Sequence, residues 1–231
     1  GDFRASFARG LAEFEAMVRT APDDPKGYEG RATARLNLAD LLLARGEQAD
    51  EELALGIRDL REALTRGAPR LSTQARLGEA HARRVQVLQG NGQDPIEELR
   101  ASIAALDEAI RIGPRDAANR ALRGQQRGTL ATLLALRRED VRELVRCAIE
   151  DLDAALQARP EDIASRFRRA VQRVVLGAQQ MAHGESPDES FRAALDDFAE
   201  VVRQDPDDID ARVRYAELLQ KYAGLLVQSG K

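Results

Sequence analysis

Ala148-Ile149-Glu150-Asp151-Leu152-Asp153-Ala154-Ala155-Leu156, closed by Pro160, is the stretch that decides the fold. The closing proline recurs at intervals of 46 residues, and one register holds an alanine that is itself followed by a proline. A constant period between about 20 and 50 residues is typical of stacked supersecondary units. The sequence therefore predicts a repeat protein, whose anchor positions are Pro22, Ala68, Pro114, Pro160 and Pro206.

Further columns keep the same register. The tenth position after each anchor holds a residue no larger than alanine, the twelfth position before it holds another small residue, and the eighth position before it holds a large apolar residue. These columns predict that two helices in each unit approach closely through small residues. They read Ala32, Gly78, Gly124, Ala170, Ala216; Gly10, Gly56, Ser102, Ala148, Ala194; and Phe14, Leu60, Leu106, Leu152, Phe198.

Each unit holds two helical segments joined by a short loop. In the first, small or apolar residues recur along one helical face. A glycine at the twenty-fourth position past the anchor predicts its C-terminal cap at Gly46, Gly92, Gly184 and Gly230, with Arg138 as the exception. We expect an all-α fold of about nine long helices in antiparallel pairs. The predicted single domain, 1–231, has units at 1–22 (second helix only), 23–68, 69–114, 115–160, 161–206 and 207–231 (first helix only).

Composition narrows the class of protein. No uncharged apolar run approaches the ~18 residues of a membrane span, and no signal peptide is visible at the start of the sequence. The net charge of −4 comes from 35 basic and 39 acidic residues, which argues against nucleic-acid binding. A single cysteine fits a reducing compartment. We expect a cytoplasmic protein with neither a membrane nor a nucleic acid as partner.

The segments Leu122-Arg123-Gly124 and Ala148 to Pro160 resemble the tetratricopeptide repeat (TPR) consensus, and the resemblance covers the whole chain. The usual TPR period is about 34 residues, so both helices are longer here. The bulky aromatic residue of the family's first helix is also missing, because that column reads Tyr28, Gln74, Arg120, Arg166 and Arg212. The resemblance implies a right-handed α-solenoid.

Proteins of this family bind other proteins, commonly a peptide along the groove of their first helices, and they are seldom enzymes. Similar arrays also occur as regulatory segments of larger bacterial signalling proteins. The resemblance therefore implies a scaffold or regulatory module, and we expect a fragment of a larger signalling protein.

The sequence offers little catalytic chemistry. His81 and His183 are far apart in register and have no partner at metal-ligand or triad spacing. Cys147 is a lone helical cysteine, the usual setting of a packing residue. Acidic residues such as Asp59, Asp151 and Asp197 recur together with arginines, so structural ion pairs are favoured over a catalytic pair. We predict no enzyme activity, no cofactor and no metal site.

The resemblance places the groove at the eighth, eleventh and fifteenth positions after each anchor. This lining mixes apolar and mainly basic residues, which would suit an extended, partly apolar and acidic segment. The alternative is that its arginines are merely solvated. The carboxylate clamp of some family members is absent. The candidate partner-binding residues are Arg76, Glu79, Arg83, Gln125, Thr129, Arg168, Val171, Val175, Arg214 and Lys221.

A second hypothesis is self-association. The sequence opens with an unpaired second helix, about 2–20, and closes with an unpaired first helix, about 207–229. One molecule could complete a unit with the next, and such a head-to-tail contact forms rings or open fibres.

Overall fold

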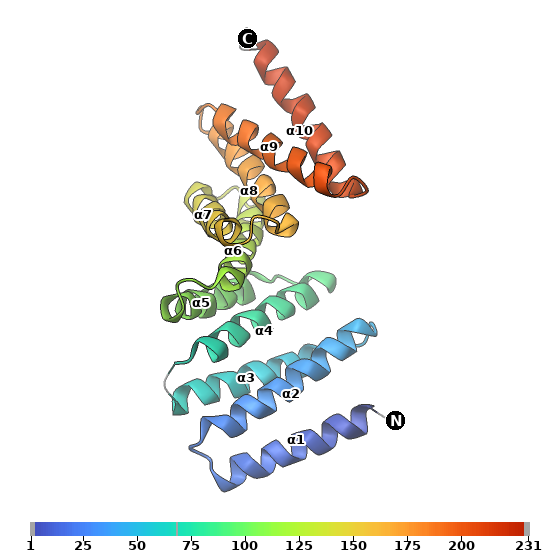
Figure 1. The fold of residues 1–231 in the computed structure, drawn as a ribbon, viewed down its shortest axis with the longest axis vertical. Helices are drawn as coiled ribbons and strands as arrows, with labels where there is room; N and C mark the ends of the chain where they lie inside the picture. The colour runs from blue at the N-terminus through green and yellow to red at the C-terminus, as the bar shows by residue number, and fades with distance from the viewer. Residues whose placement is uncertain (1–2, 68, 229–231) are drawn as a thin grey trace. The chain divides into compact units, whose positions relative to one another are not determined.

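The computed structural model describes residues 3–67 and 69–228, which form ten helices and no strand (Figure 1). The all-α prediction is confirmed. The expected count of about nine was one too low, because four predicted units with two helices and two with one amount to the ten helices observed. The helices are α1 (Phe3–Thr20), α2 (Pro25–Ala44), α3 (Asp50–Arg66), α4 (Leu71–Gly90), α5 (Ile96–Ile112), α6 (Ala117–Leu136), α7 (Arg142–Ala158), α8 (Ile163–Ala182), α9 (Asp188–Gln204) and α10 (Ile209–Gln228).

The contacts divide the chain into two compact units, Gly1–Asp116 and Ala117–Lys231. In unit 1, α2 packs on α3 and α4 packs on α5; in unit 2, α6 packs on α7 and α8 packs on α9. Each of these pairs falls within one predicted repeat. The first helix of a pair has 20 residues and the second has 17. The predicted single domain over 1–231 stays a prediction.

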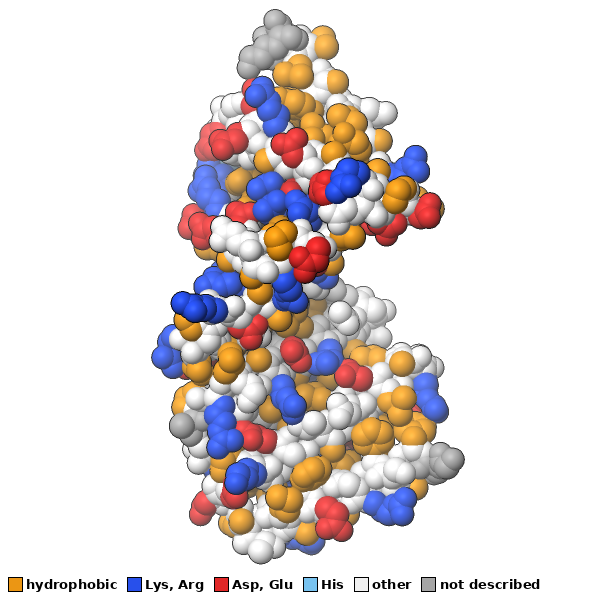
Figure 2. Space-filling model, in the orientation of Figure 1, with side chains coloured by type: hydrophobic (Ala, Val, Ile, Leu, Met, Phe, Trp, Pro, Cys, Tyr) orange, Lys and Arg blue, Asp and Glu red, His pale blue; other side chains and the backbone are white. Residues whose placement is uncertain are grey.

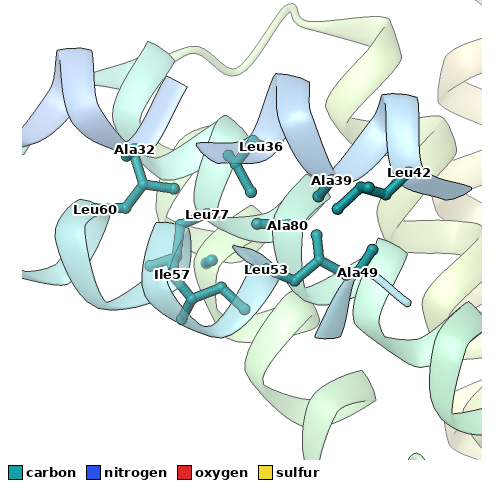
Figure 3. Close-up of a cluster of buried hydrophobic side chains, with 11 residues drawn as sticks. Ala32, Leu36, Ala39, Leu42, Ala49, Leu53, Ile57, Leu60, Leu77 and Ala80 are labelled. Carbon is teal, nitrogen blue, oxygen red and sulfur yellow. The ribbon is translucent and has the colours of Figure 1, made fainter. Parts of the chain in front are cut away.

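The core of unit 1 explains its small-residue columns. Leu36, Leu53 and Leu60 of α2 and α3 interdigitate in a buried cluster (Figure 3). A Cβ atom on Gly78 of α4 would lie 2.6 Å from Leu106 Cγ of α5. Because Gly78 has no side chain, the two backbones can approach closely. Ser102 Oγ donates a hydrogen bond of 2.8 Å to the Gly78 carbonyl oxygen.

Unit 2 repeats this packing. A Cβ atom on Gly124 of α6 would lie 3.1 Å from the Ala148 carbonyl oxygen of α7. Between α8 and α9, the aromatic rings of Phe167 and Phe198 meet edge to face with centroids 5.8 Å apart. The columns read from the sequence therefore form the contact between the two helices of a pair.

The first helices end in the left-handed backbone region. Gly46, Gly92 and Gly184 have φ of 70°, 68° and 74°, where glycine has no steric penalty. Arg138 occupies the same column and adopts the same conformation, with φ of 63°. The left-handed turn at the end of the first helix therefore forms even where the column holds no glycine. Gly230 lies outside the described residues.

Candidate functional site

Each helix pair except α4–α5 is joined by a buried aspartate that two arginines hold. In unit 2, Asp197 of α9 accepts hydrogen bonds of 2.9 and 2.6 Å from Arg169 and of 2.7 Å from Arg173, both on α8. Arg123 and Arg127 of α6 hold Asp151 of α7 in the same way, and Arg31 and Arg35 of α2 hold Asp59 of α3. The interpretation as structural ion pairs is confirmed, so these carboxylates are engaged within the fold.

The α4–α5 pair has a different polar contact. The arginine and aspartate columns read Leu77, His81 and Ala105 there. His81 is buried, and its Nδ1 atom lies against Glu98 Oε2, while Arg84 Nη1 donates to Glu98 Oε1 at 2.8 Å. The hydrogen bond with His81 lowers the pKa of Glu98 below its ordinary value, although burial acts in the opposite direction. His81 is thus a structural residue of the interhelical contact.

Four of the predicted groove residues meet in one pocket of unit 2. Val171 and Val175 of α8 and Arg214 and Lys221 of α10 line a cavity of about 350 Å³. Its remaining lining residues are Thr132 of α6, Val174 of α8, Phe198 of α9, and Glu217 and Leu218 of α10. We call this cavity the valine pocket. Its wall is mainly apolar, and its charged groups come from α10.

The charged groups of the valine pocket differ in how firmly they are held. Arg214 Nε donates to both carboxylate oxygens of Asp210 at 3.1 Å. The ammonium group of Lys221 lies 5.3 Å from the centroid of the Phe191 ring and has no acidic partner among the described residues. Lys221 is therefore the cation best placed to meet an incoming carboxylate.

Arg168, Gln125 and Thr129 do not line the valine pocket. Arg168 lies one turn before Val171 on α8, half-buried and without a hydrogen-bonded partner in the part of the chain that the structure describes. Burial lowers its pKa below the ordinary value, and the charge of Asp162 offsets part of this effect. A partly desolvated, unpaired guanidinium can bind an anion more strongly than a solvated one. Gln125 and Thr129 of α6 are half-buried and share an intrahelical hydrogen bond of 3.0 Å.

The other predicted residues belong to unit 1. Arg83 of α4 contacts Asp40 of α2 at 2.6 Å and Glu79 at 3.7 Å, so these two predicted residues are paired with each other. Arg76 donates to Thr33 of α2. It also borders a second cavity, of about 590 Å³, which we call the α1–α2 cavity. That cavity is lined by Ser6, Phe7, Gly10, Phe14, Gly30, Thr33, Ala34, Asn37 and Arg76.

Sequence reasoning missed several lining residues. Thr132 and Val174 lie outside the three expected groove columns, and Phe198 belongs to a column that reads as pure core. The sequence could have predicted three lining residues of the α1–α2 cavity, because the eighth, eleventh and fifteenth positions after Pro22 are Gly30, Thr33 and Asn37. Extending the groove columns to the first anchor would have found them.

No family model and no curated protein matches the sequence. Solved structures match its fold. YrrB, described as a TPR protein with an unusual peptide-binding site, is similar over 91% of this chain and 84% of its own, with 14% identity and a TM-score of 0.63.

The chain has the tetratricopeptide-repeat fold.

A second protein with this TPR fold is MamA from Desulfovibrio magneticus RS-1, whose structure starts at residue 41. It is 16% identical, with a TM-score of 0.55, over 83% of this chain and 85% of its own. Identities this low establish the fold alone. Among the helices that the structure describes, none has the length and apolar character needed to cross a membrane.

Proposed function

We propose that the chain is a non-catalytic protein-interaction scaffold or regulatory module, and that the valine pocket binds a peptide with an apolar side chain and a nearby acidic group. The single observation that carries this proposal is the pocket itself. Val171, Val175 and Leu218 offer an apolar wall, while Lys221 lies at the same pocket without an acidic partner among the described residues. The peptide-binding site named for YrrB, which has the same fold, supports the same class of function.

The chemistry of the pocket favours binding over catalysis. The aspartates with the deepest burial, Asp59, Asp151 and Asp197, are held by arginines. The pocket contains one carboxylate, from Glu217, and no histidine or cysteine. A cytoplasmic location and a place within a larger signalling protein belong to this proposal and rest on the sequence alone.

The test is a titration of the full chain with two fluorescein-labelled peptides. In the first, a leucine pair is flanked by glutamates, and in the second, lysines replace the glutamates. We expect the acidic peptide to bind more tightly, and Lys221→Glu to weaken that binding by about tenfold, which corresponds to about 1.4 kcal/mol. Lys26→Glu is the matched control, because Lys26 is an exposed lysine of α2 in unit 1.

Equal binding of both peptides, or equal losses from Lys221→Glu and Lys26→Glu, would contradict the assignment of the acidic preference to this pocket. Saturable binding of neither peptide would remove the valine pocket as a peptide site.

Head-to-tail self-association remains the second candidate, because α10 exposes an apolar face. Ile209 and Val227 are 75% and 78% exposed, and Val213 and Leu219 are also exposed. Figure 2 shows hydrophobic side chains on the visible face of α10. Sedimentation of the full chain tests this candidate. We expect the apparent mass to rise with concentration, and Leu219→Lys to suppress the rise; a constant monomer mass would overturn it.

A further inference from the structure

Arg168 of α8 is a half-buried cation that has no counter-ion within residues 3–67 and 69–228. It makes neither a hydrogen bond nor an ion pair there, and burial lowers its pKa below the ordinary value, with a partial offset from the charge of Asp162. The carboxylate of Asp162 accepts hydrogen bonds of 3.1 and 2.6 Å from the backbone N–H and the hydroxyl of Ser165, so it caps α8 instead. The donors of Arg168 are therefore available to another group.

The other two arginines in the column of Arg168 are paired inside the fold. Arg76 of α4 donates to a threonine hydroxyl of α2. Arg214 Nε of α10 donates to Asp210, which lies four residues earlier on the same helix. Four residues before Arg168 the sequence has Ala164, whose side chain contains no acceptor. The lack of a partner is therefore particular to α8.

Both of these paired arginines extend toward the preceding first helix. Arg76 of α4 reaches the residue at the eleventh position after the anchor in α2. The guanidinium carbon of Arg214 on α10 lies 5.8 Å from the centroid of the Phe167 ring on α8. α8 itself contacts α6, where the eleventh position holds Gln125, and the Gln125 side chain has no hydrogen bond with any residue that the structure describes. We therefore expect the Arg168 guanidinium to lie toward Gln125.

Arg168 lies beside the valine pocket. It comes one turn before Val171 on α8, whereas Lys221 of α10 shares the column of Val175. These two columns are two helical turns apart, or about 10 Å along the helix axis, and the apolar wall lies between them. Within unit 2, α8 has a first helix on each side, because it contacts α6 and shares the valine pocket with α10. The groove therefore has one cation at each end of its apolar wall.

We propose that Arg168, together with the side-chain amide of Gln125, forms a second carboxylate-binding position, so that the bound peptide carries an acidic side chain on each side of its apolar residue. This inference rests on the peptide binding proposed for the valine pocket. Lys221 binds one acidic group and Arg168 binds the other, while the apolar side chain enters between them. A guanidinium can donate two parallel hydrogen bonds to a carboxylate, and such charge-assisted bonds are stronger in a partly desolvated site than in water.

The half-buried setting of Arg168 favours an anionic ligand over simple solvation. A guanidinium that loses part of its water without gaining a partner raises the free energy of the unliganded protein. A carboxylate that docks there supplies the missing counter-ion, so its binding removes that penalty. The exposed Arg214, which already has Asp210 as its partner, would gain less from a ligand.

The test is binding of four peptides to the full chain, followed by fluorescence anisotropy. Each peptide has a central leucine pair, a fluorophore at its amino end and an amide at its carboxyl end, so no terminal carboxylate is present. Glutamates stand on both sides of the leucines, only before them, only after them, or on neither side, and glutamines take the remaining places. We expect the peptide with glutamates on both sides to bind about tenfold more tightly than either one-sided peptide.

Variants of the chain separate the two positions. Arg168→Gln should weaken binding of one one-sided peptide by about tenfold and leave the other unchanged, and Lys221→Gln should do the reverse. Arg146→Gln is the matched control, because Arg146 is an exposed arginine of α7. Gln125→Glu places a carboxylate beside Arg168 and should reproduce the effect of Arg168→Gln, with Gln157→Glu, at an exposed glutamine of α7, as its control. Circular dichroism verifies that the variants keep their helices.

The proposal is overturned if Arg168→Gln and Lys221→Gln weaken the same one-sided peptide, because the groove would then have a single acid-binding position. It is also overturned if Arg168→Gln affects both one-sided peptides equally. If Arg168→Gln changes no peptide while Lys221→Gln weakens binding, the valine pocket remains a peptide site and only the second position is wrong. If none of the four peptides binds saturably, the proposed function fails together with this inference.

Discussion

At the level of single residues, the repeat keeps a glycine at the end of most first helices and loses it at one. Gly46, Gly92 and Gly184 end their helices in the left-handed region, and Arg138 takes the same backbone conformation despite its side chain. A residue with a Cβ atom costs about 1–2 kcal/mol in this conformation. The neighbouring helices α6 and α7 therefore hold Arg138 in a local conformation that its own sequence disfavours.

Replacing Arg138 with glycine should stabilise the protein. The substitution removes the steric penalty but increases the conformational entropy of the unfolded chain, so we expect a net gain of about 0.5–1 kcal/mol in the free energy of unfolding. Urea denaturation measures the change, with Arg137→Gly as the control for losing an arginine in the same turn. A lower stability for Arg138→Gly would contradict this account of the turn.

Glu98 predicts a pH dependence of stability. Its pKa is lowered in the folded state, mainly by the hydrogen bond with His81, so the ionised form stabilises the fold. This contribution is complete above the unfolded pKa, about 4.3, and is lost as the pH falls through the lower folded value. Glu98→Gln should therefore have a lower free energy of unfolding than the wild type at pH 7. The difference between the two should narrow below about pH 4.

Chemical denaturation between pH 7 and pH 3 measures this difference. Glu97→Gln is the matched control, because Glu97 is the preceding residue of α5 and its side chain is 92% exposed. A gap between the wild type and Glu98→Gln that stays constant over this range would show that the carboxylate contributes no acid-sensitive stability.

Pairs of helices are the element that the sequence predicts best. The small columns and the large apolar column are determined by contacts within one pair, such as Gly78 against Leu106, so they recur with the period of the repeat. The ion pairs of Asp59, Asp151 and Asp197 recur for the same reason. The contact of Arg83 with Asp40 joins two first helices, and no column of the repeat indicates it.

The buried ion pairs predict that the stability of a helix pair depends strongly on a single carboxylate. Asp151 is 2% exposed and contacts Arg123 and Arg127. Asp151→Ala would leave these guanidinium groups partly buried without their counter-ion, so we expect a loss of about 3–5 kcal/mol in the free energy of unfolding.

Thermal and urea denaturation test this prediction, and Glu150→Ala is the matched control, because Glu150 is the exposed preceding residue of α7. We expect the control to change the stability by less than about 0.5 kcal/mol. Equal effects of the two substitutions would mean that the Asp151 ion pairs do not stabilise the α6–α7 pair.

For the molecule as a whole, the period predicts the helices and their pairing, whereas the cavities depend on how neighbouring pairs pack. The resemblance to the TPR family predicted four groove residues that meet in the valine pocket, namely Val171, Val175, Arg214 and Lys221. Thr132 and Phe198 complete that pocket from α6 and α9, and their contribution depends on side-chain packing that a column of residues does not encode.

Amide chemical-shift mapping of the isotope-labelled full chain, titrated with the acidic leucine peptide, tests the proposed binding function most directly. The account predicts that the largest shifts fall on the first helices of unit 2, around Val171, Val175 and Lys221. Largest shifts on α7 and the outer face of α9, or no shift at saturating peptide, would contradict it.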